Sequence, residues 1–560
     1  MYSEAYQSLS KEGKRLVDEA IAILEPNYDD ATGMIVHRRG TRVFASNRGG
    51  MYYALALLMK GEHPDRVEKL INAVIDTQID APEEVFHGVY RHLNAPEPRP
   101  GKMDYKRLGT FGRYFTDLFY EQTVNAFRQN LVNDPELAPL ARKIENHLNA
   151  AVVQEFPIVW TTYEPNSREF ILMVLAMLVE HFEKELSPET VKRIDHSAAL
   201  AVQGAIDRSR SNFAPLNTNI QIMHVFVLDY FGVRHGRQDI VDYALEYAEK
   251  MVAQYLEYHA VAEFNSPTYC GVDLATIGYW RRYGSSERLK ELGEILETGI
   301  WRDEMEFYNP AMRNLCGPFS RSYELEMSVH THFLAMLYWA LGEEKFPWPL
   351  RSTESDSNAL LVLGGVNLPE DVKRAVFEPK KDVKLYRQFR ELSERGDPAN
   401  NNALCTATGW ISEDLMTGAL AGSENPSHQL HPLVVYWRGP EALGTVKVLR
   451  RTEDGVLRHL HTVYFNGVAD REHVTLDVDV AVNRDVTVYY EIEYPGVGDS
   501  AVIEDGCWKL PGLRVRVDAQ APECFLERKG NILRVCYLSK ASEPETKKMR
   551  FDLHFDLVKD

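Results

Sequence analysis

The chain has 560 residues, too many for one hydrophobic core, so its length predicts two or more domains. Its 44% hydrophobic and 26% charged residues are ordinary for a folded globular protein. The formal net charge of −19 offers no positive field for nucleic acid, and no stretch of about 18 apolar residues is long enough to span a membrane. We therefore expect no nucleic-acid or membrane partner. The polar start, without an apolar signal region, leads us to expect a cytoplasmic location.

The first 350 or so residues show the apolar spacing of amphipathic helices, one after another. The stretch 10–24 is an example, because Leu16, Val17, Ala20, Ile21 and Leu24 recur at helical intervals. Further helices are expected at 51–59, 67–75, 137–152, 168–186, 189–206, 220–231, 240–258, 272–283, 286–298 and 324–341. No fixed repeat length joins them. Antiparallel helical hairpins can nevertheless close into a ring, so residues 1–350 are predicted to form an incomplete α/α toroid.

The pattern changes after Phe346, where two prolines interrupt the helical run. Residues 351–402 are predicted to be a linker or transition. From 403 to 560, short runs of alternating apolar and polar residues are separated by Gly, Asp and Asn turns, which is typical of antiparallel strands. About ten such strands favour a β-sandwich. The predicted fold is thus an α/α toroid of helical hairpins followed by an antiparallel β-sandwich.

Polar residues gather in four loops that each run into an expected helix. The first loop contains Glu263, Asn265 and Tyr269, and the second contains Asn217, Asn219 and His224. A third contains Arg321, Tyr323 and His330, and a fourth contains Tyr163, Glu164 and Arg168. Each residue also has an ordinary structural explanation, as a helix cap or as a buried ring with a satisfied polar group. In a toroid, however, loops on the same side of successive hairpins converge on one cavity.

The stretch Glu263-Phe-Asn-Ser-Pro-Thr-Tyr269 is similar to the Glu-x-Ser-x-x-Tyr stretch of heparinase-type lyases, offset by one residue. Together with the order of helices and strands, it resembles the α/α-toroid polysaccharide lyases, which include hyaluronate, alginate and heparinase-type lyases. The resemblance implies β-elimination in a uronate-containing chain. It also implies an Asn that neutralises the uronate carboxylate, a Tyr or His that removes the C5 proton, and a Tyr that protonates the leaving oxygen. Where that stretch often ends in Tyr-His, this chain has Tyr269-Cys270.

This chemistry selects residue types. Amide or guanidinium donors must neutralise the carboxylate, and a base with a tunable proton affinity must take the proton. The residues predicted to be catalytic are Tyr269, His224, Asn217, Asn219, Arg321 and Glu263. Those predicted to bind substrate are Arg168, Tyr163, Glu164, Asn265, Tyr323 and His330. The expected partner is an acidic oligosaccharide or polysaccharide, and the chain is a candidate homo-oligomer.

Two other functions remain open. A glycoside hydrolase on the same scaffold needs two carboxyl groups about 5 to 9.5 Å apart, and Glu164 and Glu263 are candidates. A glycan-binding protein without activity fits the same fold. No cofactor or metal is expected, because no cysteine or histidine spacing is typical of a metal site. His330 and His332, two residues apart, are predicted to point to different faces of one helix.

Overall fold

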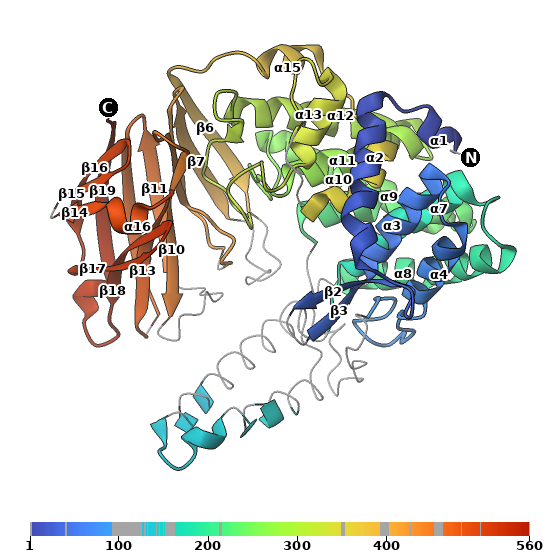
Figure 1. The fold of residues 1–560 in the computed structure, drawn as a ribbon, viewed down its shortest axis with the longest axis horizontal. Coiled ribbons are helices and arrows are strands. Elements are labelled where there is room, and N and C mark those ends of the chain that lie inside the picture. Colours follow the sequence, from blue (N-terminus) through green and yellow to red (C-terminus); the bar gives the residue numbers. More distant parts are fainter. Residues whose placement is uncertain are drawn as a thin grey trace.

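The structure is a computed structural model, and Figure 1 shows its helices at one end and its larger sheets at the other. It describes residues 3–39, 42–91, parts of 126–151, 163–211, 216–348, 353–391, 403–425, 427–452, 463–482, 484–504 and 506–558. The predicted fold class, helices followed by antiparallel strands, is confirmed. Among the described residues, no helix combines the length and the apolar character needed to cross a bilayer.

The helical body is built from long helices and a few short ones. They are α1 (Glu4–Gln7), α2 (Lys11–Leu24), α3 (Asn47–Lys60), α4 (Pro64–Ile75), α7 (Ser167–Phe182), α8 (Pro188–Ser211), α9 (Thr218–Arg234), α10 (Gln238–Tyr258), α11 (Cys270–Tyr283), α12 (Glu287–Phe307), α13 (His332–Leu341), α14 (Asn358–Gly364) and α15 (Glu370–Ala375). Short 3₁₀ turns are η1 (Glu25–Asn27), η2 (Ala138–Leu140) and η3 (Thr353–Ser357). The helix predicted at 137–152 lies partly outside the described residues.

The helices form an inner and an outer layer. Each inner helix contacts the next in the order α2, α3, α7, α9, α11 and α14, and α14 contacts α2 again, so these helices close a circuit. The inner helices α3, α7 and α9 are apolar almost all round and are buried accordingly. Helices α4, α8, α10 and α12 each pack outside the inner helix that precedes them and have one buried face. Because hairpins alternate between the layers, the inner helices α3, α7, α9 and α11 all begin at the same end of the circuit.

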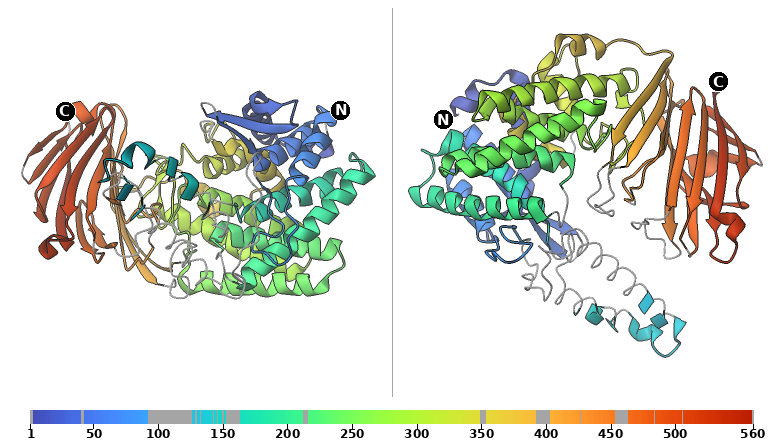
Figure 2. Two further views of the ribbon diagram at one scale, coloured as in Figure 1. Left: turned by 90° about the horizontal axis from the view of Figure 1, so that it is seen from below. Right: turned by 180° about the vertical axis from the view of Figure 1, so that it is seen from behind.

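Two sheets form the sandwich seen at the C-terminal end in Figures 1 and 2. One sheet has the order β17-β18-β13-β10-β9-β8-β7-β6 and the other β11-β12-β19-β16-β15-β14, with antiparallel neighbours throughout. The strands are β6 (Val383–Arg390), β7 (Leu404–Ile411), β8 (Leu415–Ala421), β9 (Leu433–Arg438), β10 (Leu443–Thr452), β11 (Val463–Asp470), β12 (His473–Val480), β13 (Val486–Glu493), β14 (Val502–Glu504), β15 (Cys507–Leu510), β16 (Leu513–Gln520), β17 (Cys524–Lys529), β18 (Ile532–Ser539) and β19 (Lys548–Leu557).

Smaller elements complete the fold. Strands β1 (Tyr28–Asp29), β2 (Met34–Arg39) and β3 (Arg42–Ser46) form a sheet before α3, and β4 (Tyr308–Asn309) pairs with β5 (Asn314–Leu315). The short helix α16 (Val497–Ser500) and the turn η4 (Pro544–Lys547) lie within the sandwich sequence.

Strands β8 and β9 are buried on both faces, which explains their nearly continuous apolar sequence. Leu433 and Trp437 belong to the core between the two sheets. Val434 and Tyr436, on the opposite face, belong to the core of the helical body. The first sheet is therefore packed directly against the helices. At this interface Gly418 leaves room for the loop between β5 and α13, because a Cβ at Gly418 would lie 2.0 Å from the carbonyl oxygen of Gly317 in that loop.

The predicted linker, residues 351–402, contains η3, α14, α15 and β6. Strand β6 pairs with β7 over its full length, so the sheet begins before residue 403. As an edge strand, β6 buries only Leu385 and Phe389 and therefore lacks a strong apolar pattern. Helix α14 completes the inner circuit.

The helix predicted at 324–341 begins only at His332. The preceding backbone bonds elsewhere: Phe319 pairs with His431, and the N–H of Ser322 donates to the carbonyl of Gln429 at 2.9 Å. The phenol of Tyr436 donates to the carbonyl of Leu325. These bonds hold the segment as a loop against the sheet, so its polar side chains project from an irregular backbone.

Candidate active site

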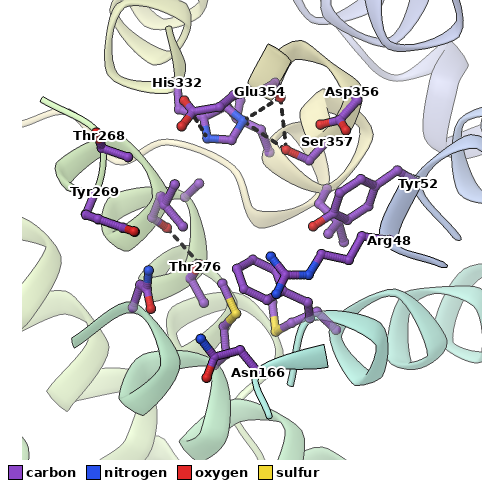
Figure 3. A pocket seen from close by; sticks show the side chains of 18 of the residues that line it. Arg48, Tyr52, Asn166, Thr268, Tyr269, Thr276, His332, Glu354, Asp356 and Ser357 are labelled. Atoms are coloured by element: carbon purple, nitrogen blue, oxygen red, sulfur yellow. Dashed lines mark hydrogen bonds and ion pairs between the residues drawn. The ribbon is translucent and has the colours of Figure 1, made fainter. Parts of the chain in front are cut away.

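A cavity of about 410 Å³ opens where the four inner helices α3, α7, α9 and α11 begin. The loop before α13 and the turn η3 complete its wall. It is lined by Ser46, Arg48, Tyr52, Glu164, Asn166, Phe170, Met173, Asn219, Met223, Thr268, Tyr269, Val272, Ala275, Thr276, Tyr279, Arg321, Tyr323, His330, His332, Glu354, Asp356, Ser357, Leu360 and Leu361. Figure 3 shows many of these side chains facing one another across the space. Helix N-termini carry partial positive charge, so their convergence favours an anionic ligand.

Arg321 is held beside Tyr269 by groups from two segments of the chain. Its guanidinium lies over the Tyr269 ring, with the Cζ atom 4.3 Å from the ring centroid. One Nη donates to the buried carboxylate of Glu263, and Nε donates to Oε1 of Gln429 at 2.8 Å. Gln429 belongs to the loop between β8 and β9, so the sandwich domain helps to orient this arginine. An arginine fixed in this way presents its charge at a defined place in the cavity wall.

Asn219 is fixed through the same carboxylate. The backbone N–H of Asn219 donates to Oε2 of Glu263 at 2.8 Å, and the N–H of Glu263 donates to the hydroxyl of Thr218 at 3.1 Å. The Asn219 side chain lines the cavity, and its Oδ1 has no hydrogen-bond partner among the described residues. Glu263 therefore holds both Arg321 and the start of α9 from behind the cavity wall.

Asp273 follows Tyr269 by one turn of α11 and is buried. Within the described part of the chain, neither of its carboxyl oxygens has a hydrogen-bond partner. Burial raises the pKa of Asp273 well above its usual range, and the charges of Glu263 and Glu304 raise it further. Burial also raises the pKa of Glu304 to about 8. Burial thus disfavours the charged form of both groups, whereas Glu263 is ion-paired with Arg321.

His330 and His332 both meet Glu354, contrary to the prediction that they point apart. Nδ1 of His330 lies 2.6 Å from Oε1 of Glu354. Nε2 of His332 is within 3.0 Å of both the Glu354 carbonyl and the Ser357 hydroxyl, as Figure 3 shows. The prediction was wrong because His330 precedes the helix and only His332 belongs to it. Nε2 of His330 has no hydrogen-bond partner among the described residues.

The structure divides the twelve predicted site residues in two. Six line the cavity: Asn219, Tyr269, Arg321, Glu164, Tyr323 and His330. Six do not: Asn217, His224, Glu263, Asn265, Arg168 and Tyr163.

Three of the excluded residues have structural roles beside the cavity. The amide of Asn265 donates to the carbonyls of Cys316 and Pro318 at 2.6 and 3.0 Å, and it therefore ties down the loop that carries Arg321. Asn217 occupies the N-cap position of α9 but makes no capping hydrogen bond, and its buried amide has no hydrogen-bond partner among the described residues. Glu263 lies behind the cavity lining, where it accepts hydrogen bonds from the Asn219 backbone and from Arg321.

The other three lie within the core. Arg168 is buried and donates to the His87 carbonyl at 3.1 Å, and burial lowers its pKa to about 10. Tyr163 packs edge-on against Phe86 at 5.8 Å between ring centroids. His224 is fully buried, with its Nδ1 3.6 Å from Oε1 of Glu169. It follows Asn219 by five residues, which turns its side chain about 140° away around the helix.

Several cavity residues were not predicted from the sequence. Arg48 and Tyr52 belong to a helix whose first residues, Asn-Arg-Gly-Gly, resemble a turn. Asp356 belongs to the predicted linker, and burial raises its pKa to about 7. The Ser46 cap before Gly49 is the one local sign that a helix begins there. No three His, Cys, Asp or Glu side chains of the described residues are grouped as a metal site requires.

The chain is similar to solved polysaccharide lyases at low sequence identity. A heparinase III is 10% identical, with a TM-score of 0.35 over 98% of this chain and 85% of that chain. A mutant of the chondroitin AC lyase of Streptomyces coelicolor A3 is also 10% identical, with a TM-score of 0.35 over 91% of this chain and 83% of that chain. The same lyase, solved with chondroitin sulphate, is 8% identical, with a TM-score of 0.28 and coverage of 98% and 100%. Both belong to the class of α/α-toroid polysaccharide lyases that the sequence resemblance indicated.

Comparison with curated proteins finds no match. A family model described as a domain of unknown function (DUF8769) matches residues 14–115 and 148–359. The matched residues make up more than half of the chain and include the inner helices whose ends surround the cavity, and the chain therefore belongs to this family.

Proposed function

We propose that the chain is a carbohydrate-active enzyme that cleaves a uronate-containing oligosaccharide or polysaccharide by β-elimination in this cavity. One observation carries the proposal: Asn219, Arg321, Tyr269, Tyr323 and His330 line a single cavity at the N-terminal ends of the inner helices. An amide and a guanidinium can neutralise a carboxylate, while a phenol and an imidazole can move protons.

Neutralisation of the carboxylate comes first. The C5 proton of a uronate is a weak acid until the charge of the adjacent carboxylate is balanced. Arg321 and the amide of Asn219 are the donors for that carboxylate, and Glu263 holds both in place. The helix N-termini add positive potential at the same end of the body.

His330 is the proposed base. Its Nδ1 lies against the Glu354 carboxylate, which accepts a hydrogen bond from Nδ1–H and thereby leaves the lone pair on Nε2. As Nε2 takes the C5 proton, the electron pair of the C5–H bond forms the C4=C5 double bond. The C4–O bond breaks with its electron pair on oxygen. Tyr269 protonates that oxygen, and Arg321 beside its ring stabilises the resulting phenolate.

The test is to incubate the protein with a panel of uronate-containing oligosaccharides and to follow two products. β-Elimination produces a conjugated unsaturated uronate that absorbs in the ultraviolet, together with one new reducing end for each cleavage. Equal growth of both signals is the expected result. If no uronate substrate yields the ultraviolet signal, the elimination proposal is wrong.

The cavity favours one alternative, a glycoside hydrolase. Asp356 lines the cavity together with the carboxyl groups of Glu354 and Glu164, and its pKa of about 7 suits a general acid. The earlier candidate Glu263 does not line the cavity and is paired with Arg321. New reducing ends without ultraviolet absorbance would identify hydrolysis, and Asp356→Asn would then abolish it.

A further inference from the structure

The wall formed by α3 and the start of α7 presents hydrogen-bond donors across the cavity from Tyr269, as Figure 3 shows for Arg48, Tyr52 and Asn166. None of these three residues has a role in the proposed elimination. We call Arg48, Asn166 and the Phe170 ring, which Arg48 contacts, the α3–α7 wall. Its polar groups are held by Arg208, which does not line the cavity, and by Glu164, which does.

Asn166 has one possible orientation. Its Oδ1 accepts a hydrogen bond from Nη1 of Arg208 at 2.7 Å. A guanidinium has only donors, so the amide oxygen must face Arg208 and the amide nitrogen must face away. Figure 3 shows that nitrogen on the cavity side. Arg208 is buried, and its Nη1 lies 4.0 Å from the buried carboxylate of Glu169. Although burial raises the pKa of Glu169, His224 and the two nearby arginines bring it below its usual value, so the carboxylate stays charged opposite Arg208.

Arg48 is held beside Asn166 by a second carboxylate. Its Cζ atom lies 3.7 Å from the centroid of the Phe170 ring. Its Nη2 lies 3.3 Å from Oε1 of Glu164, and the same oxygen accepts the backbone N–H of Asn166 at 3.1 Å. Glu164 thus joins Arg48 to the start of α7. Of the five N–H groups of a guanidinium, this contact uses one, and Arg48 remains partly exposed in the cavity.

We infer that the α3–α7 wall is a second subsite, which binds the carboxylate of a neighbouring sugar when the cleaved uronate is held at Arg321. A planar guanidinium beside an outward amide N–H matches the acceptor geometry of a carboxylate. A carboxylate held at Arg321 leaves the donors of the opposite wall unused, so a ligand that satisfies both walls carries two acidic groups. The inference deepens the proposed function and rests on it: the substrate class is a chain with a second acidic sugar near the cleaved bond.

The test measures binding rather than turnover. In a Tyr269→Phe background, which should slow cleavage about 10²- to 10⁴-fold, calorimetry compares oligouronates of two to four sugars with their methyl esters. Arg48→Gln removes the charge. Asn166→Asp keeps an acceptor for Arg208 but puts a carboxylate oxygen in place of the N–H donor. Gln203→Glu adds the same negative charge at an exposed site on α8 and is the matched control.

Each wall variant should raise Kd for the acid oligosaccharide about 10-fold or more, as expected for a lost charge-assisted hydrogen bond. The methyl ester should bind weakly and be insensitive to the substitutions, and the control should match its parent. Unchanged affinity in the Arg48→Gln variant overturns the inference, and this partly exposed position is the safeguard if Asn166→Asp does not fold. Weakened binding with no elimination product from the unsubstituted protein would overturn the proposed function and support the subsite. If no acid oligosaccharide binds, both are overturned.

Discussion

Replacing Tyr269 with Phe separates a role in proton transfer from a role in packing. The ring is buried and keeps its contacts, with Arg321 at 4.3 Å and the Tyr323 ring at 6.2 Å between centroids. Only a hydroxyl is lost, so the free energy of unfolding should fall by about 1 kcal/mol. Turnover of a cleavable uronate substrate should fall by about 10²- to 10⁴-fold, or about 3 to 5 kcal/mol in activation free energy. The activity loss should therefore exceed the stability loss.

The assay measures Tm and kcat on the same preparation. Tyr90→Phe is the matched control, because Tyr90 is also buried and its hydroxyl lies 2.7 Å from that of Ser197, outside the cavity lining. The control should melt slightly earlier and keep its turnover. If the Tyr269→Phe variant retains the parent kcat, Tyr269 plays no part in proton transfer. A lowered Tm with normal turnover would show that its role is structural.

Three further substitutions test the surroundings of the site. Glu263→Gln removes the buried charge opposite Arg321 and should lower the free energy of unfolding by about 3 kcal/mol, measured in urea; an unchanged midpoint would contradict the pairing. Burial raises the pKa of Asp356 from 3.8 to about 7, so between these values only the folded protein keeps the proton, and stability falls as pH rises. In the Asp356→Asn variant the free energy of unfolding should fall by about 2 to 4 kcal/mol less over this pH range. Parallel plots of unfolding free energy against pH for the two proteins would refute the pKa shift. Gly418→Ala must displace the Gly317 carbonyl, so it should lower the free energy of unfolding by about 1 to 3 kcal/mol and reduce turnover. An unchanged Tm would show that the interface between sheet and loop accommodates the added methyl group.

Local periodicity predicts most of the fold because the burial of each helix follows its own sequence. The inner helix α7 is apolar almost all round, and α12 has one apolar face, so their layers follow from pattern alone. The helix expected before His332 failed for a non-local reason. The backbone just before it bonds to Gln429 and His431, and its own Leu325 carbonyl accepts the phenol of Tyr436. These partners come about a hundred residues later, so no window of the sequence contains that competition.

The site was predictable where residues stand at helix starts. Asn219, Tyr269 and Glu164 all lie at N-terminal ends of inner helices or just before them, and alternating hairpins bring those ends together. For residues further along a helix, the direction in which the side chain points around the helix axis decides whether it lines the cavity. On α9, Met223 follows Asn219 by four residues and lines the cavity, whereas His224 is one residue further and lies among Glu169 and two tyrosine rings.

The contacts of Arg321 join the helical body to the sandwich. Glu263 and Tyr269 come from the loop between α10 and α11, whereas Gln429 comes from the sheet domain. An arginine with only the Glu263 contact would be free to turn about that carboxylate. The bond to Gln429 fixes the plane of the guanidinium over the Tyr269 ring. Because Gly418 lets the loop before Arg321 lie flat on β8, the packing of the sheet against the helices determines where the positive charge stands in the cavity.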